Sequence, residues 1–265
     1  PESTGLLALM YHDGIGVHPD MDKCFELAEK AALDGHDGLG YIMLGYMCDN
    51  AETPDHAEGG PRQKYDHYDA ERFYELCAEA GGYWSTAAHL WLGDFFMDMA
   101  RGGDPEIAIE HYEAIGEKKM DAACKLCDYY WEQKEYEDEH PDGYKFEGLE
   151  EKLFKWTRVA SDFKPEEYIY RLGWCYMDCI GVGEDEDGAE MARSCWEYAF
   201  DLGDWRGASA LAFLYEEQLE NLSDSEENEW ERLRCEHELE LWKKLGDIAR
   251  EKQWAEEPDC AIEED

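Results

Sequence analysis

The chain contains 265 residues, of which 66 are Asp or Glu and 24 are Lys or Arg, so its formal net charge is −42. A charge this negative repels the phosphates of nucleic acids and the anionic inner face of a membrane, which excludes direct binding to either one. Because 44% of the residues are hydrophobic and 14% are aromatic, the chain is too apolar for a disordered acidic polymer, and we expect a folded protein whose partners are basic.

A short motif recurs six times along the chain and predicts a helix at each copy. It consists of a Leu, a small residue directly after it and an aromatic residue four positions after the Leu, although the second copy is weaker. Residues four apart lie on the same face of a helix, and a small residue on that face lets a partner helix approach closely. The copies begin at Leu7, Leu44, Leu92, Leu126, Leu172 and Leu211.

A second stretch with apolar residues at helical spacing follows each copy, and several of these stretches end on Gly, a common helix terminator. β-branched residues are scarce and strict alternation is absent, so no strand is predicted. We therefore expect an all-α protein, an α/α solenoid of about six helical-hairpin repeats that form a curved superhelix. The predicted second helices cover residues 23–34, 69–80, 106–119, 152–163, 188–202 and 232–245.

Two of the units share a longer pattern. It combines the Leu-small pair with a Gly-rich turn, a following Asp or Lys, a pair of small residues and a closing Gly. The first unit carries Gly14-Ile15-Gly16-Val17, Asp20, Lys23, Ala31-Ala32 and Gly35-His36, and the fifth carries Leu172-Gly173, Tyr176, Gly181, Val182, Ala189, Ala199 and Gly203. This pattern resembles the Sel-one-like repeat family, α/α solenoids related to tetratricopeptide repeats. The resemblance implies an adaptor or scaffold that binds other proteins in a concave groove.

The repeats also predict the domain organisation. We expect a repeat solenoid over residues 1–247, followed by a C-terminal helix end and an acidic tail over residues 248–265. Three stretches interrupt the helical rhythm, near residues 49–68, 132–151 and 216–231. In a solenoid, such insertions form loops that project from one edge.

The concave face of stacked hairpins is lined by their first helices, so binding residues are sought there. Two residues lie between the Leu-small pair and the aromatic residue, and we expect one of them to pack against other helices and the other to face the groove. In the first and fifth units an acid also follows the motif. Acids beside aromatic rings suit ligands that carry Arg or Lys. Tyr46 and Trp174 could equally be ordinary core residues between repeats. The partner-binding candidates are Tyr46, Asp94, Asp128, Trp174, Asp13 and Asp178.

Two cysteine pairs invite a redox or zinc interpretation, Cys124 with Cys127 and Cys175 with Cys179. Cys127, however, stands in the small position of the motif, and Cys175 occupies a core position of its helix. Core packing therefore explains these thiols better. The chain also lacks the ligand spacings of a metal site and the motifs of a nucleophilic or nucleotide-binding enzyme, so neither a cofactor nor a metal is expected.

The sequence favours a cytoplasmic adaptor or scaffold without catalysis, which binds a basic protein or peptide in its concave acidic groove. A small-molecule substrate is not expected. The cytoplasmic location follows from ten cysteines diluted over the whole chain and from first residues unlike a secretory signal. Two alternatives stay open. One is an acidic inhibitor, either a nucleic-acid mimic or an immunity protein that neutralises a basic toxin or nuclease. The other is an enzyme or metal protein that uses the cysteine pairs.

Overall fold

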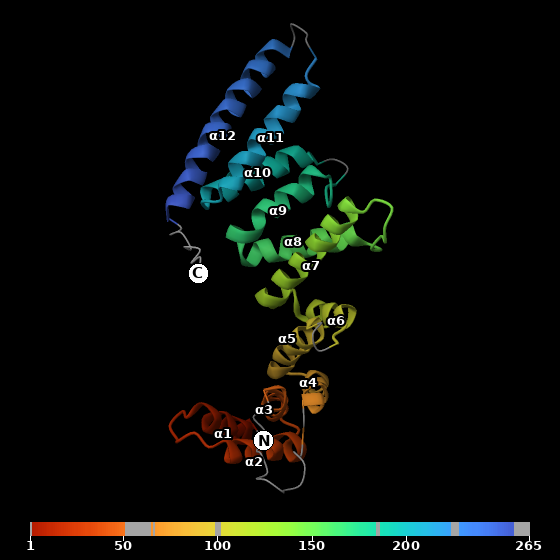
Figure 1. Ribbon diagram of the computed structural model, residues 1–265, viewed down its shortest axis with the longest axis vertical. Coiled ribbons are helices and arrows are strands. Elements are labelled where there is room, and N and C mark those ends of the chain that lie inside the picture. The colour runs from red at the N-terminus through yellow and green to blue at the C-terminus, as the bar shows by residue number, and fades with distance from the viewer. Residues whose placement is uncertain are drawn as a thin grey trace, which may run out of the picture. The chain divides into compact units, whose positions relative to one another are not determined.

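A computed structural model describes residues 2–50, 65, 67–98, 102–183, 186–223 and 228–256. Within these residues every regular element is helical, with twelve α-helices and one π-helical segment (Figure 1). The prediction of an all-α fold is confirmed. The chain divides into two compact units, residues 1–122 and residues 123–265, and the division falls inside one helix.

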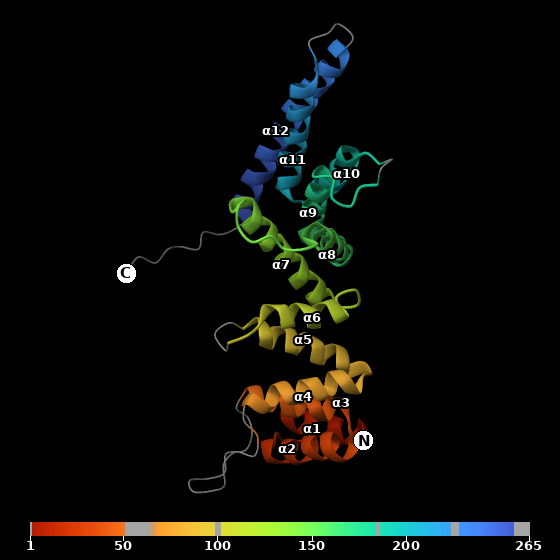
Figure 2. The same ribbon diagram turned by 90° about the vertical axis from the view of Figure 1, so that its right-hand side faces the viewer.

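Unit 1 is built from helices that pack in chain order, each against the next. The first and third helices also touch, as do the third and fifth, so that the hairpins stack (Figure 2). The predicted pairing of first and second helices is confirmed here. The elements are α1 (Glu2–Asp13), α2 (Met21–Glu29) with the π-helical segment Lys30–Asp34, α3 (Gly38–Asp49), α4 (His67–Ala80), α5 (Tyr83–Met97) and α6 (Pro105–Ile115).

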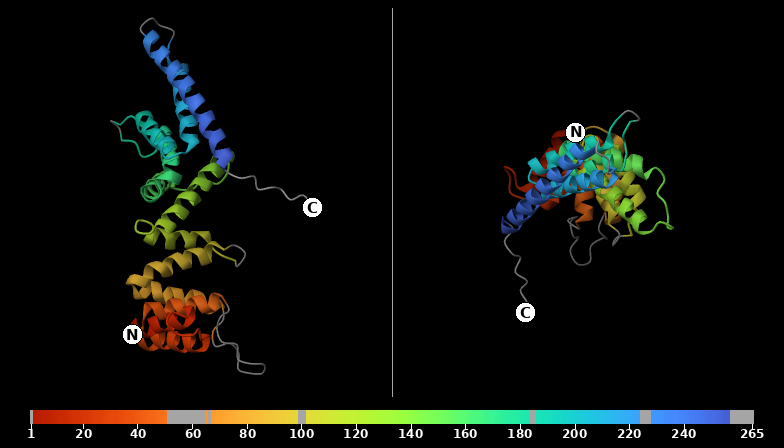
Figure 3. Two further views of the ribbon diagram at one scale, coloured as in Figure 1. Left: turned by 90° about the vertical axis from the view of Figure 1, so that its left-hand side faces the viewer. Right: turned by 90° about the horizontal axis from the view of Figure 1, so that it is seen from above.

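Unit 2 follows the same plan. Trp131 of α7 donates a hydrogen bond to Thr157 of α8 at 2.9 Å, and each later helix packs against its successor. The last two helices form a long hairpin, in which α12 alone has 28 residues (Figure 3). The elements are α7 (Met120–Glu139), α8 (Leu149–Phe163), α9 (Pro165–Met177), α10 (Gly188–Asp201), α11 (Trp205–Asn221) and α12 (Glu229–Glu256).

The six predicted second helices correspond to α2 with its π-helical extension, α4, α6, α8, α10 and α12. Two of them end elsewhere than expected. Helix α6 stops at Ile115 and a turn follows, in which the amides of Lys118 and Lys119 both donate to the Ile115 carbonyl. Helix α12 continues to Glu256, so the domain boundary predicted at residue 247 lies inside a continuous helix.

Helices extend into the stretches that the sequence marked as insertions. Helix α7 continues to Glu139 and α8 begins at Leu149, which leaves residues 140–148 as the connection within the stretch 132–151. Helix α11 continues to Asn221 and α12 begins at Glu229, within the stretch 216–231. Most of the stretch 49–68 lies outside the described residues.

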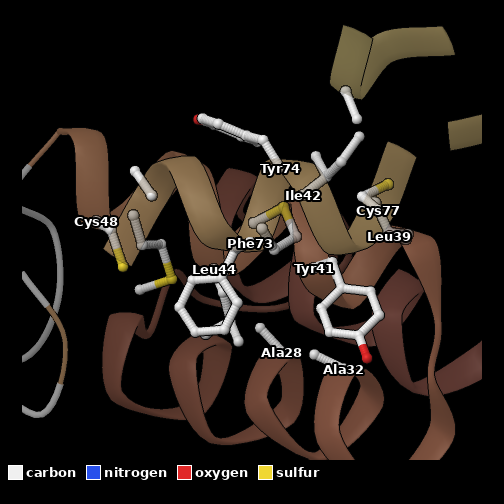
Figure 4. Packing of buried hydrophobic residues seen from close by; sticks show 14 of the residues in the cluster. Ala28, Ala32, Leu39, Tyr41, Ile42, Leu44, Cys48, Phe73, Tyr74 and Cys77 are labelled. Carbon is white, nitrogen blue, oxygen red and sulfur yellow. The ribbon is translucent and has the colours of Figure 1, made fainter. Parts of the chain in front are cut away.

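The small residue of the motif explains how the two helices of a hairpin approach each other. A Cβ atom added to Gly45 would lie 2.4 Å from the ring of Tyr74, and one added to Gly93 would lie 2.3 Å from the ring of Tyr112. Gly173 meets Trp196 in the same way. Each of these three first helices thus has a notch that takes an aromatic ring from the second helix. In unit 1 the adjoining core combines small side chains of α2 with larger ones of α3 and α4 (Figure 4).

Candidate functional site

Two of the predicted binding residues, Tyr46 and Asp94, meet in one pocket of unit 1. The pocket has a volume of about 330 Å³ and lies at the C-terminal ends of α3 and α5, with a contribution from α4. We call it the aromatic–acidic pocket. Its lining residues are Tyr46, Asp49, Asn50, Tyr74, Trp91, Asp94, Phe95 and Asp98.

Aromatic rings form one wall of this pocket. The ring of Trp91 lies 6.2 Å from that of Tyr46 and 5.2 Å from that of Tyr74, measured between centroids. His12 of α1 packs edge-on against Tyr46 at 5.4 Å. The faces of such rings carry negative electrostatic potential and attract cations. Tyr46 is therefore both a packing residue and a pocket residue, so the two predicted roles coincide in one side chain.

Carboxylates form the rest of the wall. Asp49 is the last residue of α3, Asp98 caps the C-terminus of α5, and Asp94 lies one turn before it. Helix C-termini carry partial negative charge, which adds to that of the carboxylates. The buried Tyr112 donates a hydrogen bond from its hydroxyl to Asp94, at 2.5 Å. Burial, and then this bond, raise the pKa of Tyr112 far above its ordinary value, so the tyrosine stays a neutral donor.

Asp13 lies outside the pocket. It is an exposed residue at the end of α1, and its carboxylate contacts the His12 ring at 2.6 Å, the ring that packs on Tyr46. Asp13 and Asp178, which the sequence analysis selected, each lie six residues after the Leu of their motif. The same offset from Leu92 identifies Asp98, which that reasoning missed. Asp49, Tyr74 and Trp91 have no equally regular signal.

In unit 2, Asp128 is already paired within the chain. Arg171 of α9 donates a hydrogen bond to it through Nη1, and the Tyr168 hydroxyl donates another at 3.2 Å. The Arg171 guanidinium also lies 5.8 Å from the ring of Trp131 and 5.6 Å from that of Tyr168. The sequence predicted that Asp128 would contact the cation of a bound ligand. In the structure, a cation and aromatic rings of α7 and α9 already lie beside Asp128.

Trp174 packs mainly inside unit 2. Its ring lies 5.1 Å from that of Trp196 on α10 and 5.5 Å from that of Phe213 on α11, where it joins the buried cluster of these helices. Trp174 therefore packs in the core, the role that the sequence analysis gave as the alternative to partner binding. Asp178 is exposed at the C-terminus of α9, and partial burial raises the pKa of its carboxyl. Nearby acids on α7 and α8 add to that increase, which Lys134 opposes.

Cys127 and Cys175 behave as packing residues, whereas Cys124 is partly buried and Cys179 is exposed. Cys127 is buried and its thiol donates to Thr157 at 3.5 Å. Burial raises the pKa of Cys127 to about 11 and that of Cys175 to about 12, so both are protonated at neutral pH and poorly nucleophilic. In the described part of the chain, no three His, Cys, Asp or Glu side chains gather as metal ligands. None of the described helices is long and apolar enough to cross a bilayer.

Structural comparison finds similar proteins over nearly the whole chain. One is a Sel1 repeat protein from Oxalobacter formigenes, 16% identical with a TM-score of 0.47, covering 94% of this chain and 86% of that one. Another is c5321, a protective antigen of uropathogenic Escherichia coli strains with an SLR fold, 19% identical with a TM-score of 0.49. That comparison covers 99% of this chain, which spans 57% of the length of c5321. Comparisons with protein-family models and with curated proteins found no match.

Proposed function

We propose that the chain is a cytoplasmic, non-catalytic adaptor or scaffold, and that unit 1 binds a basic segment of a partner protein in the aromatic–acidic pocket. The observation that carries this proposal is the meeting of three carboxylates with a wall of aromatic rings in one concave site. Carboxylates supply charge-assisted hydrogen bonds to Arg or Lys, and rings supply cation–π attraction of about 0.5–2 kcal/mol each.

The net charge adds a kinetic contribution. A chain at −42 produces a long-range negative potential that accelerates the approach of a basic partner at low ionic strength. Such steering acts on every basic protein and gives little specificity by itself. Specificity comes from the pocket, where the charges of Asp49, Asp94 and Asp98 are held beside the rings.

The proposal assigns binding to unit 1 and not to the corresponding residues of unit 2. There Arg171 satisfies Asp128, and Trp174 packs against its neighbours, so a ligand would have to displace contacts that the chain already makes. Replacing an internal ion pair with an external one yields little net free energy.

The test uses a fluorescent nine-residue peptide of alternating Arg and Gly, together with the same peptide carrying citrulline in place of Arg. Asp49→Asn with Asp98→Asn removes two pocket charges, and we expect at least about tenfold weaker binding of the Arg peptide, or about 1.4 kcal/mol. Fluorescence anisotropy measures it.

Glu75→Gln with Glu79→Gln is the matched control, because it removes two charges from exposed positions of α4. This control should change the affinity less than about twofold, since exposed charges are screened by salt. Equal losses in both double variants would show that net charge alone binds the peptide, and the pocket assignment would be wrong. Equal binding of the citrulline peptide would contradict it too.

A further inference from the structure

Asp37 is the most buried acid at any described helix start, and half of its carboxylate lacks a hydrogen bond. It caps the N-terminus of α3, where its Oδ1 accepts the amide of Leu39 at 3.3 Å. Only 7% of the residue is exposed. Among the described residues, no donor reaches its buried Oδ2. A buried charged oxygen without a donor is energetically costly, so this atom marks a place where a cation is favoured.

Asp37 lines a second pocket of unit 1, with a volume of about 790 Å³. We call it the Asp37 pocket. It lies at the N-terminal ends of α3 and α5, and α1 contributes to it, so it occupies the opposite ends of the helices that form the aromatic–acidic pocket. Its lining consists of Ser3, Leu6, Gly35, His36, Asp37, Gly38, Leu39, Gly81, Gly82, Tyr83 and Trp84.

Two aromatic side chains stand beside the carboxylate in this pocket. Tyr83 and Trp84 are the first residues of α5, and their rings meet edge to face at 5.0 Å. Tyr83 is 82% exposed. The cap of α5 is Gly82, which provides no side-chain hydrogen bond to the first turn. The pocket therefore combines a buried anion, exposed rings and helix-start amides.

Unit 2 contains a counterpart of Asp37 that is paired with a cation. Asp204 caps α11, and its Oδ1 accepts the amide of the residue two positions later, as Asp37 does. In both places the residue before the cap has positive φ, 48° at His36 and 95° at Gly203. The counterpart differs in its cation: Arg206 places Nε 2.9 Å from Oδ1 and Nη2 2.9 Å from Oδ2 of Asp204.

The residue that corresponds to Arg206 in unit 1 is Leu39, which is 3% exposed and part of the core. Unit 1 thus has the cap, the positive-φ junction and the buried carboxylate, but a leucine replaces the arginine. A guanidinium also lies over the first ring of α11, where Arg250 is 4.5 Å from the centroid of Trp205. Arg206 itself also makes a ring contact, since its guanidinium lies 4.9 Å from the centroid of Tyr170 on α9.

We propose that the Asp37 pocket binds an arginine side chain supplied by another polypeptide. Its guanidinium pairs with the carboxylate of Asp37, as Arg206 pairs with Asp204, and is covered by Tyr83 and Trp84. Arginine suits the site better than lysine because its planar head donates several hydrogen bonds and also stacks on rings. The uncapped amides at the start of α5 donate hydrogen bonds to a backbone carbonyl of the same peptide.

The experiment titrates the protein with the peptide acetyl-Gly-Arg-Gly-amide and follows the tryptophan indole N–H signals by NMR. The signal of Trp84, assigned through Trp84→Phe, reports on the Asp37 pocket, and that of Trp91 reports on the aromatic–acidic pocket. We expect the Arg peptide to shift the Trp84 signal and the citrulline peptide to leave it in place. A shift of the Trp91 signal alone would overturn the proposal without affecting the function proposed above.

Asp37→Asn tests the charge while it keeps the cap, because Asn caps a helix as well as Asp. We expect at least about tenfold weaker binding at the Trp84 signal, about 1.4 kcal/mol. Unchanged affinity would overturn the proposal. Tyr83→Ser is a second variant that leaves the core intact, and it should weaken binding severalfold. If methylguanidine bound as tightly as the peptide, the site would recognise a small cation and the assignment to a polypeptide would be wrong.

Arg206→Leu is the matched gain of function, because it gives Asp204 the leucine that Asp37 has. The Arg peptide should then shift the indole signal of Trp205 in this variant and not in the unchanged protein. A Trp205 signal that does not respond in the variant would contradict the equivalence of the two junctions on which the proposal depends.

Discussion

Asp37 and Asp204 occupy the same kind of position in the two units, but their carboxylates have different surroundings. Each caps a first helix after a residue with positive φ. Arg206 pairs with Asp204 inside the chain, whereas Leu39 stands in that place after Asp37. The acids further along the first helices differ similarly, since Asp128 accepts a hydrogen bond from a guanidinium and Asp94 accepts one from a neutral hydroxyl.

This difference shows how one helical plan can serve two purposes. A guanidinium cancels the charge of the carboxylate that it binds. In unit 2, Arg171 of α9 binds Asp128 of α7, and Arg250 of α12 lies over Trp205 of α11, so these two arginines link different helices. Unit 1 keeps acids and rings in pockets at both ends of α3 and α5, where a basic partner is proposed to bind.

The largest expected effect tests what the two units share. Gly93→Ala in unit 1 and Gly173→Ala in unit 2 each force a Cβ to within 2.3 Å of a buried ring. Alanine favours a helix over glycine by about 1 kcal/mol, but overpacking costs about 1–3 kcal/mol, so each variant should show a net loss of up to about 2 kcal/mol. Urea unfolding measures the loss.

Gly246→Ala on α12 is the control for this pair. Its added Cβ would lie 3.4 Å from Ala208, an ordinary contact, so the variant should be as stable as the unchanged protein or slightly more stable. A loss in all three variants would mean that the aromatic notch is not the cause.

The next effect should have opposite signs in the two units. Asp204→Asn removes one partner of the ion pair with Arg206 while keeping the cap, and we expect a loss of about 1 kcal/mol because Arg206 is partly exposed. Asp37→Asn removes a buried charge whose Oδ2 has no donor among the described residues, so stability should stay the same or rise by about 1 kcal/mol. Thermal and urea unfolding of both variants measure the signs. A clear loss from Asp37→Asn would show that its carboxylate is satisfied inside unit 1.

The smallest effect concerns pH and is expected in unit 1. His89 of α5 and His111 of α6 place their Nδ1 atoms 3.0 Å apart, and burial lowers the pKa of both below 6.5. The charge of His89 lowers the pKa of His111 further, and Glu110 opposes this. The unfolded chain therefore binds these protons more readily, so stability is fully present above about pH 6.5 and falls as the pH decreases below it.

Hydrogen exchange at pH 7.5 and pH 5.5 tests this prediction. The amides of α5 and α6 should lose protection at the lower pH, and His89→Gln should reduce that loss. Helices α8 and α9 of unit 2 contain no histidine and serve as the reference. The prediction would be wrong if α8 and α9 lost as much protection as α5 and α6.

The sequence by itself determined the helices and their pairing. The Leu-small-aromatic motif encodes a local packing rule, and Gly45, Gly93 and Gly173 each meet a ring because a missing side chain leaves room only at that point. The arrangement of all the hairpins into a single curved superhelix stays a prediction. Cys127 shows that the rule tolerates a variation, since Thr157 replaces the ring where a cysteine replaces the glycine.

Tertiary structure alone decided which acids and rings belong to a site. Tyr46 and Trp174 occupy the same position of the motif, directly after the Leu-Gly pair. Tyr46 lines a pocket with Trp91, whereas Trp174 packs against Trp196 and Phe213. The sequence does not distinguish Asp37 from the other 65 acids, because its importance depends on the burial of its carboxylate and on the missing hydrogen-bond donor at Oδ2. Helical periodicity determines which face of a helix is apolar, but the environment of a charge depends on side chains that are distant in the chain, and only packing brings these together.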